Sequence, residues 1–193
     1  MSLHASVMTM LLALPPAHAD LDEQNRSERV EVIASAISQA TQRACCSGAY
    51  ASEECSRLWA GSESSLAALI VTKGWWESRF ALNVHLGECK PWECDAVKLS
   101  NGSVMHLART PWQFQRTAFS APLWTDMVGT GIEPTRNAAW VAARILSHGM
   151  KSCKSIEGTI AWYATGRCQW SKARDRYATY RKLTSLLASR RDS

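Results

Sequence analysis

The chain has 193 residues, which is enough for one domain with a substantial core and too few to predict two. Hydrophobic residues make up 46% and charged residues 20%, so intrinsic disorder is not expected. The net charge of +5 suits an anionic polymer or surface, but the basic residues form no stripe interleaved with aromatic residues, which excludes the usual nucleic-acid-binding pattern. We interpret the C-terminal basic residues as a solvated helix face and tail.

Residues 1–19 have the pattern of a secretory signal peptide, with a short apolar run and an A-x-A box at 17–19. Its first segment is unusual because His4 is the basic group there. The alternative is a buried N-terminal helix. No other run approaches the roughly 18 apolar residues of a membrane span. We therefore predict an exported periplasmic or extracellular protein of the cell envelope, without stable membrane insertion, whose residues 20–193 form a single domain; its oligomeric state stays open.

Seven cysteines fit an oxidising compartment and fall into local groups. The predicted bridges are Cys89–Cys94, Cys153–Cys168, and one of Cys45 or Cys46 with Cys55. One thiol is then left over. A zinc site is the alternative, but the cysteines lack a C-x-x-C pair and a histidine at ligand spacing. We therefore predict no metal and no other cofactor, and no cysteine stands out as an activated nucleophile.

Most of the chain has helical periodicity. The first predicted helix of the main domain covers residues 27–44, and its apolar face consists of Val30, Ile33, Ile37 and Ala40. A second helix is predicted to begin at Ser62 or Ser64 as N-cap and to run through "LAALIVTKGWW". Residues 81–110 then change to an irregular insertion, with a hairpin turn at Asn101-Gly102.

Three more helices are predicted towards the C-terminus. Thr135 is expected to cap a helix over residues 136–150 that Gly149 ends, and a short helix follows over 155–166. The last helix covers residues 171–189, and its apolar stripe consists of Trp170, Ala173, Tyr177, Tyr180 and Leu183. The predicted fold class is therefore mainly α, with a small irregular or β-hairpin insertion and disulfide staples.

Glu77 follows Trp75 and Trp76 at the expected end of the second helix. Burial against a tryptophan and the partial negative charge of a helix C-terminus both predict a raised pKa for this carboxyl group. Arg79 would oppose this, but residues two apart on a helix do not face each other. A protonated carboxylic acid near neutral pH is what cleavage of a glycosidic bond needs. The alternative is a surface acid beside packed aromatic rings.

Three short segments together resemble a known family. "ESRF" at 77–80 is similar to the Glu-Ser motif that closes the catalytic helix in soluble lytic transglycosylases and goose-type lysozymes, of the lysozyme-like superfamily. "PWQFQ" at 111–115 is similar to the end of the family's second motif, and "AWYATG" at 161–166 to its third. The segments occur in family order within residues 60–180. The chain departs from the family at Ala164, where the third motif has asparagine.

The resemblance implies a lysozyme-like helical domain with Glu77 as general acid/base. Gln113 would line the cleft and either hydrogen-bond sugar or position Glu77, and Tyr163 would place its hydroxyl near Glu77. Ser78 would hydrogen-bond substrate or its own helix end. Trp112 would stack on a sugar ring; Trp76 is a weaker candidate for the same role, with ordinary packing preferred.

The expected substrate is the glycan strand of peptidoglycan, cleaved at the β-1,4 bond between N-acetylmuramic acid and N-acetylglucosamine. The transglycosylase route needs a single carboxylate and yields a 1,6-anhydro product. Inverting hydrolysis would need a second carboxylate, for which Glu93 and Asp95 are the candidates. The alternatives are a non-catalytic glycan-binding protein and a disulfide-stapled helical interaction protein, in which Glu77 would point to solvent.

Overall fold

The computed structural model describes residues 1–15, 23–86, 96–98, 100–102, 104–106 and 108–190, which are mainly helical and so confirm the predicted class. The helices are α1 (Leu3–Leu12), α2 (Glu23–Cys45), α3 (Glu63–Ser78), α4 (Leu82–Leu86), α5 (Ala121–Met127), α6 (Ile132–Cys153), α7 (Ile156–Thr165) and α8 (Ala173–Ser189), with 3-10 turns at Gly48–Tyr50 and Arg116–Ala118. Strand β1 (Ala96–Lys98) pairs with β2 (Val104–His106), and β3 (Ala108–Arg109) with β4 (Phe114–Gln115), both antiparallel.

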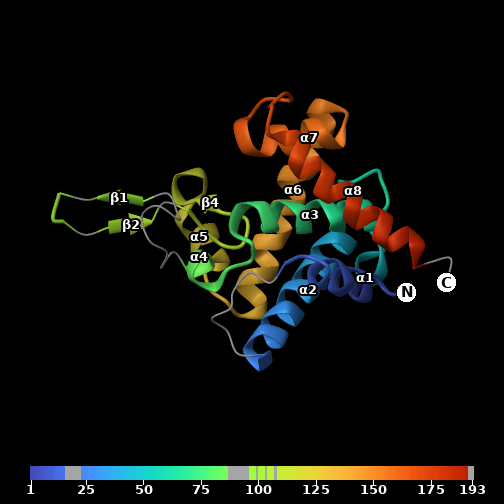
Figure 1. Cartoon of the computed structure of the whole chain (residues 1–193), viewed down its shortest axis with the longest axis horizontal. Coiled ribbons are helices and arrows are strands. Elements are labelled where there is room, and N and C mark those ends of the chain that lie inside the picture. The colour runs from blue at the N-terminus through green and yellow to red at the C-terminus, as the bar shows by residue number, and fades with distance from the viewer. Residues whose placement is uncertain (16–22, 87–95, 99, 103, 107, 191–193) are drawn as a thin grey trace.

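Helix α3 is the central element and contacts α1, α2, α6 and α8 (Figure 1). Its first turn is capped by Ser62, whose hydroxyl accepts a hydrogen bond from the Ser65 amide at 3.2 Å, so Ser62 rather than Ser64 is the N-cap. Every residue from Leu66 to Gly74 is buried. A helix surrounded on all sides has no solvent-facing polar stripe, which explains why residues 66–71 are apolar throughout; the buried polar residues Thr72 and Lys73 follow them. The helix ends at Arg79, which has the left-handed conformation common at helix C-termini.

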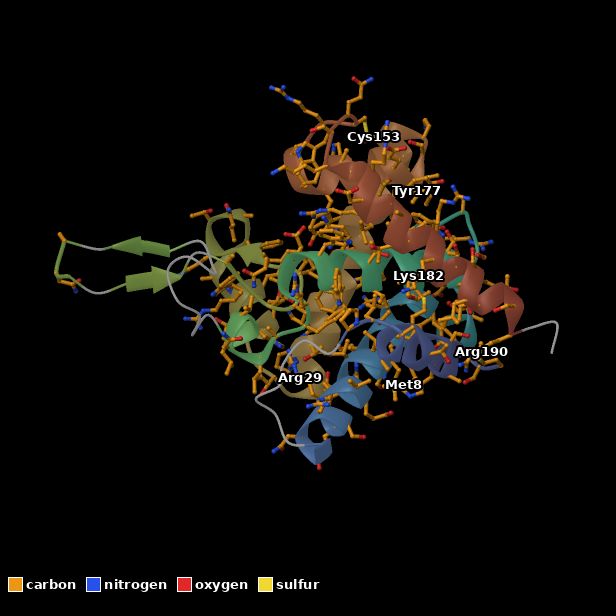
Figure 2. All side chains as sticks on the ribbon, viewed as in Figure 1. Met8, Arg29, Cys153, Tyr177, Lys182 and Arg190 are labelled. Carbon is orange, nitrogen blue, oxygen red and sulfur yellow. A yellow bond between two sulfur atoms is a disulfide. The ribbon has the colours of Figure 1, made fainter. Side chains whose placement is uncertain are left out.

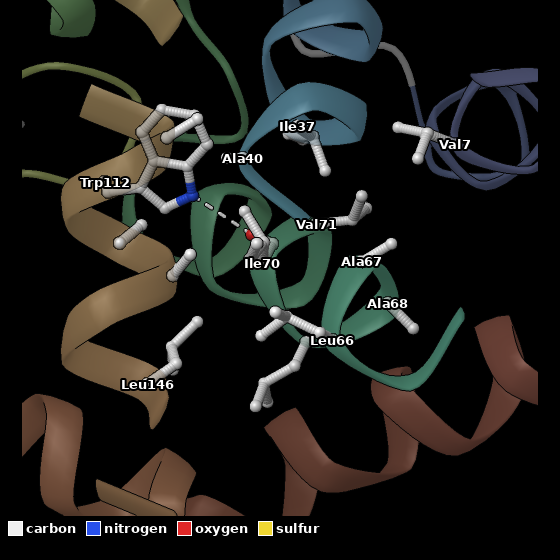
Figure 3. Close-up of a cluster of buried hydrophobic side chains, with 14 of the residues drawn as sticks. Val7, Ile37, Ala40, Leu66, Ala67, Ala68, Ile70, Val71, Trp112 and Leu146 are labelled. Carbon is white, nitrogen blue, oxygen red and sulfur yellow. Dashed lines mark hydrogen bonds between the residues drawn. The ribbon is translucent and has the colours of Figure 1, made fainter. Parts of the chain in front are cut away.

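The hydrophobic core forms around α3. Val7 of α1, Ile37 of α2 and Val71 of α3 belong to the same buried cluster (Figure 3). Trp112 lies in that cluster on the side nearer the end of α3, and its indole Nε1 donates to the Ile70 carbonyl oxygen at 3.1 Å. The core therefore extends to the loop that follows the hairpin and fixes that loop against α3.

The N-terminal segment is a helix in this structure. Val7 and Met10 of α1 are fully buried, and α1 contacts α2, α3 and α8. This is the buried N-terminal helix that the sequence offered as the alternative. Cleavage after Ala19, and with it the division into a signal peptide and a mature domain, stays a prediction. Among the described helices, none is both long and apolar enough to cross a membrane.

Helix α6 corrects two predicted boundaries. It begins after Gly131, and Thr135 lies inside its first turn with its hydroxyl donating to the Gly131 carbonyl at 2.8 Å. Gly149 does not end the helix, which continues to Cys153. A Cβ atom at Gly149 would lie 3.0 Å from the Trp162 ring of α7. The glycine therefore permits the close approach of α6 and α7 instead of stopping α6.

Helices α2, α3, α7 and α8 and the β1–β2 hairpin match predicted elements, although α2 begins at Glu23, four residues before its predicted start. Ser155 caps α7 by accepting a hydrogen bond from the Gly158 amide at 3.1 Å, and Gly166 ends it with a φ of 71°. The hairpin of β1 and β2 turns at Asn101 and Gly102 and projects from the helical body (Figure 1). The short helices α4 and α5 were not predicted.

Two disulfides are present among the described residues, Cys46–Cys55 and Cys153–Cys168. They confirm two predicted bridges and choose Cys46 over Cys45, while the predicted Cys89–Cys94 bridge lies outside the described residues. Cys45 is free and buried, and burial followed by the charge of Glu63 raises the pKa of its thiol to about 11. Figure 2 shows Cys153 at the α7 end of the molecule, where its bridge ties the end of α6 to the segment that leads into α8.

Candidate active site

A pocket of about 590 Å³ lies between the end of α3, the loop before β4, and helices α7 and α8. Glu77, Gln113 and Tyr163 all line it, although they come from segments that are far apart in the sequence. Phe114 and Trp170 also line the pocket and contribute apolar surface to it. The three segments that carry the family resemblance therefore meet at one place.

Glu77 is bound by two cations in this pocket. Its Oε1 accepts a hydrogen bond from Lys73 Nζ at 2.7 Å, and the same oxygen accepts one from the Arg176 guanidinium. Lys73 is one helical turn before Glu77 on α3, whereas Arg176 comes from α8. The Lys73 side chain is fully buried, while that of Glu77 is 21% exposed. Both cations bind the same oxygen, Oε1, so Oε2 accepts no hydrogen bond from either of them.

This arrangement corrects the expectation that Glu77 has a raised pKa. Burial does raise the pKa of its carboxyl group, but the charges and hydrogen bonds of Lys73 and Arg176 outweigh burial and lower it below its usual value. Glu77 is therefore ionised at neutral pH in the substrate-free protein. Burial also lowers the pKa of Lys73 to about 8, against the opposing effect of Glu77.

The tryptophans next to Glu77 contact a cation. The Arg176 guanidinium lies 4.8 Å from the centroid of the Trp170 ring and 5.6 Å from that of Trp76. Trp76 is also held by its indole N–H, which donates to the Thr179 hydroxyl at 3.0 Å. Trp75 packs edge-on against Trp76 and against the core. The rings thus hold Arg176 beside Glu77, and the prediction that burial against a tryptophan keeps Glu77 protonated is wrong.

Tyr163 contacts Lys73 through its ring and the Gln113 loop through its hydroxyl. Lys73 Nζ lies 4.2 Å from the centroid of its ring. The hydroxyl donates to the Trp112 carbonyl oxygen at 3.0 Å, which ties α7 to the loop. Burial and the charge of Glu77 both raise the pKa of Tyr163, so it stays a neutral donor. Tyr163 thereby links the loop that carries Gln113 to Lys73, one of the two cations that bind Glu77.

Gln113 lines the pocket from the loop. Its φ of 52° is in the left-handed region, and its amide Nε2 donates to the carbonyl oxygens of Thr110 at 3.1 Å and Val84 at 3.3 Å. The side chain therefore joins the loop to α4. Gln113 therefore lies in the pocket lining, as the resemblance implied, while its predicted hydrogen bond to sugar or to Glu77 stays a prediction.

Trp112 and Ser78 do not line the pocket. Trp112 is 0% exposed, so its ring cannot stack on a ligand and the predicted sugar contact is wrong. Ser78 is also buried; its hydroxyl donates to the Pro111 carbonyl at 2.7 Å and accepts from the Phe80 amide at 3.0 Å. Of the two roles predicted for Ser78, the structure shows the local one, extended to the loop that carries Gln113.

A second buried pair supports this side of the pocket. Arg29 of α2 donates to the Phe80 carbonyl at 3.0 Å and to His85 Nδ1 at 3.0 Å. Burial and then the charge of Arg29 lower the pKa of His85 to about 3, so the imidazole is neutral. The His85 carbonyl in turn accepts from the Thr110 amide at 3.1 Å. This series of hydrogen bonds, from Arg29 on α2 through His85 on α4 to Thr110, thus holds the loop that carries Gln113.

Sequence reasoning missed both cations at Glu77. The spacing of Lys73 four residues before Glu77 is a local signal that predicts their contact on one helix face. Arg176 has no comparable signal, because it lies in a run of basic residues interpreted as a solvated face and reaches Glu77 only through the packing of α8 against α3.

The candidate second carboxylates Glu93 and Asp95 lie outside the described residues. Within the described part of the pocket lining, Glu77 is the only carboxylate. The described residues also contain no group of three histidine, cysteine or acidic side chains that could hold a metal ion.

Comparison of the chain with models of known protein families, with curated proteins and with solved structures finds no match.

Proposed function

We propose that this protein is a peptidoglycan-cleaving enzyme that acts on the β-1,4 bond between N-acetylmuramic acid and N-acetylglucosamine, with Glu77 as general acid/base. The observation that carries the proposal is the convergence of Glu77, Gln113 and Tyr163 on one pocket of about 590 Å³. They come from the three segments whose order resembles the lytic transglycosylases. A pocket of this size accommodates a small ligand such as part of a glycan strand.

The transglycosylase route, which needs a single carboxylate, suits the described part of the pocket lining, where Glu77 is the one carboxylate. In the first step a protonated Glu77 gives its proton to the glycosidic oxygen as the bond from that oxygen to C1 breaks. Glu77 then accepts the proton of the C6 hydroxyl as this oxygen bonds to C1, which yields the 1,6-anhydro product and restores the acid. Gln113 and Tyr163 position the reacting groups in this scheme.

The resting state of Glu77 has a consequence for pH dependence. Because Lys73 and Arg176 lower its pKa, the protonated fraction of free enzyme is small at neutral pH and grows as the pH falls. We expect kcat/KM, which reports the free enzyme, to increase from neutral towards acid pH. Initial rates measured on solubilised glycan strands across this range check the expectation, and a flat profile would contradict it.

Digestion of purified peptidoglycan by wild type and by Glu77→Gln, with products read by mass spectrometry, tests the function. We expect 1,6-anhydro ends from wild type and a loss of at least about a hundredfold in the variant, since a general acid contributes on this scale. Glu133→Gln, which removes an exposed carboxylate on α6, is the matched control and should keep full activity.

Reducing ends in place of anhydro ends would indicate hydrolysis and return attention to Glu93 and Asp95. Equal activity of wild type and Glu77→Gln would overturn the role of Glu77. A wild type that binds glycan strands but releases no product would favour the non-catalytic glycan-binding alternative, which Ala164 and the ionised Glu77 keep in consideration. The interaction-protein alternative predicts Glu77 in solvent, whereas Glu77 is ion-paired in a pocket.

A further inference from the structure

The two cations at Glu77 differ in what can reach them. Lys73 is fully buried beneath Glu77 and the Tyr163 ring, and it does not line the pocket. Arg176 does line the pocket, and its side chain is 15% exposed. A ligand in the pocket can therefore contact Arg176 while Lys73 keeps its place.

The Arg176 guanidinium is also prepared for a second acceptor. Trp76 and Trp170 contact the guanidinium through their rings, and its NH1 edge binds a single oxygen of Glu77. A guanidinium has five N–H donors in a planar fork that fits a carboxylate with two parallel hydrogen bonds. The stacked rings restrain the cation, so binding such a carboxylate costs less side-chain entropy than at a free arginine.

From this geometry we infer that Arg176 is the binding site for an anionic group on the substrate, and that capture of this anion releases Glu77 for protonation. The inference rests on the proposed function for its substrate class. Two carboxylates of peptidoglycan have this chemistry: the lactyl carboxylate of a peptide-free muramic residue, and the carboxylates of the stem peptide where that peptide is attached.

The charges around Glu77 determine whether an anion bound at Arg176 raises or lowers the pKa of Glu77. The charged and titratable groups that face Glu77 are Lys73 on α3, Tyr163 on α7 and Arg176 on α8. When Arg176 turns to a ligand carboxylate, Glu77 loses one of its two cationic partners, retaining Lys73, and gains a nearby negative charge. Both changes raise the pKa of Glu77, so it takes a proton from solvent when an anionic substrate is bound. A neutral glycan would leave Glu77 ionised.

The same competition predicts an unusual effect of Glu77→Gln. In wild type the ligand must compete with the Glu77 carboxylate for Arg176. In the variant that anion is gone, so an anionic ligand should bind more tightly although turnover is lost. A site without this competition would show unchanged or weaker binding.

Binding to Glu77→Gln, measured by calorimetry and by tryptophan fluorescence, tests the inference without turnover. The probes are a peptide-free tetrasaccharide of alternating N-acetylglucosamine and N-acetylmuramic acid, the same tetrasaccharide carrying stem peptides, and the neutral N-acetylglucosamine tetramer. We expect at least one anionic probe to bind about tenfold more tightly than the neutral one. Preference for the peptide-free probe identifies the lactyl group, and preference for the peptide-bearing probe identifies the stem peptide.

Arg176→Gln, in the Glu77→Gln background, should abolish this preference, whereas Arg174→Gln removes an exposed charge from the same helix and should retain it. Arg176→Lys keeps the charge without the fork, so an intermediate preference is expected; it also provides a second reading if the glutamine variant does not fold.

Equal affinity for neutral and anionic probes, or a preference that persists without Arg176, would overturn the inference. Failure of the proposed function looks different: the anionic preference would be present while wild type released no product from peptidoglycan.

Discussion

The two sides of the pocket are held together by different kinds of interaction. On the Gln113 side, hydrogen bonds to backbone groups join the loop to α3, α4 and α7, as in the contacts of Ser78 with Pro111 and of Tyr163 with Trp112. On the Arg176 side, α8 meets Glu77 through an ion pair and two aromatic rings.

This difference separates a rigid side from a responsive one. Backbone carbonyls and amides do not titrate, so the Gln113 side keeps its geometry across a wide pH range. The Arg176 side depends on the charge of one carboxylate, which pH, salt or a competing anion changes. The proposed switch at Arg176 would thus act on the titratable contacts of the pocket and leave the backbone-bonded loop of Gln113 in place.

The largest expected effect comes from breaking the Gln113 side at Trp112. We expect Trp112→Ala to lower the free energy of unfolding by about 3–5 kcal/mol, because it empties a fully buried site and removes the bond to Ile70. Urea denaturation followed by circular dichroism measures this. Trp112→Phe keeps most of the volume and should cost less. A ring that served a sugar instead would give unchanged stability and weaker glycan binding.

A smaller effect is expected at Gly74 on α3. A Cβ there would lie 2.3 Å from the Phe80 ring and 3.2 Å from Trp112 Nε1. The clash outweighs the better helix propensity of alanine, so Gly74→Ala should cost about 1–3 kcal/mol in the free energy of unfolding.

The same change made in a Phe80→Ala background is the control for that result. The substitution should then cost less, because the ring that the new Cβ meets has gone. An equal cost in both backgrounds would show that the approach of α3 to Phe80 does not limit this position.

The smallest effect concerns the Arg176 side and appears only in acid. The pKa of Glu77 is lowered in the folded state, so its ion pairs stabilise the fold above the unfolded-state pKa, and this contribution is lost as pH falls through the folded-state value. The stability difference between wild type and Glu77→Gln should therefore shrink as pH decreases below about 4.5. Denaturation midpoints of both proteins at several pH values measure it, and a difference that stays constant down to acid pH would contradict it.

Local signals predicted much of the fold. Ser62, Ser155 and Gly166 mark helix boundaries because a cap is an interaction between neighbouring residues. Gly149 was misread as a helix end because its role is to admit the Trp162 ring of another helix. Sequence shows that a glycine is present, but only packing shows what comes close to it.

The candidate site divides in the same way. The resemblance to the three transglycosylase motifs predicted that Glu77, Gln113 and Tyr163 lie together, and all three line the same pocket. Trp112 was predicted to stack on a sugar ring. The sequence alone does not distinguish a tryptophan that contacts ligand from one that fills the core. Its burial follows from contacts with α3 that no local pattern specifies.

By itself, the sequence determined the mainly helical class, the hairpin turn, the approximate boundaries of α3, α7 and α8 and the carboxylate at the end of α3, since each depends on residues within a few positions. Only the tertiary structure decided the charge state of that carboxylate. Arg176 lies 99 residues from Glu77 in the chain and reaches it through the packing of α8 on α3. Electrostatic energy depends on distance in space, so the pKa of Glu77 is a property of the fold.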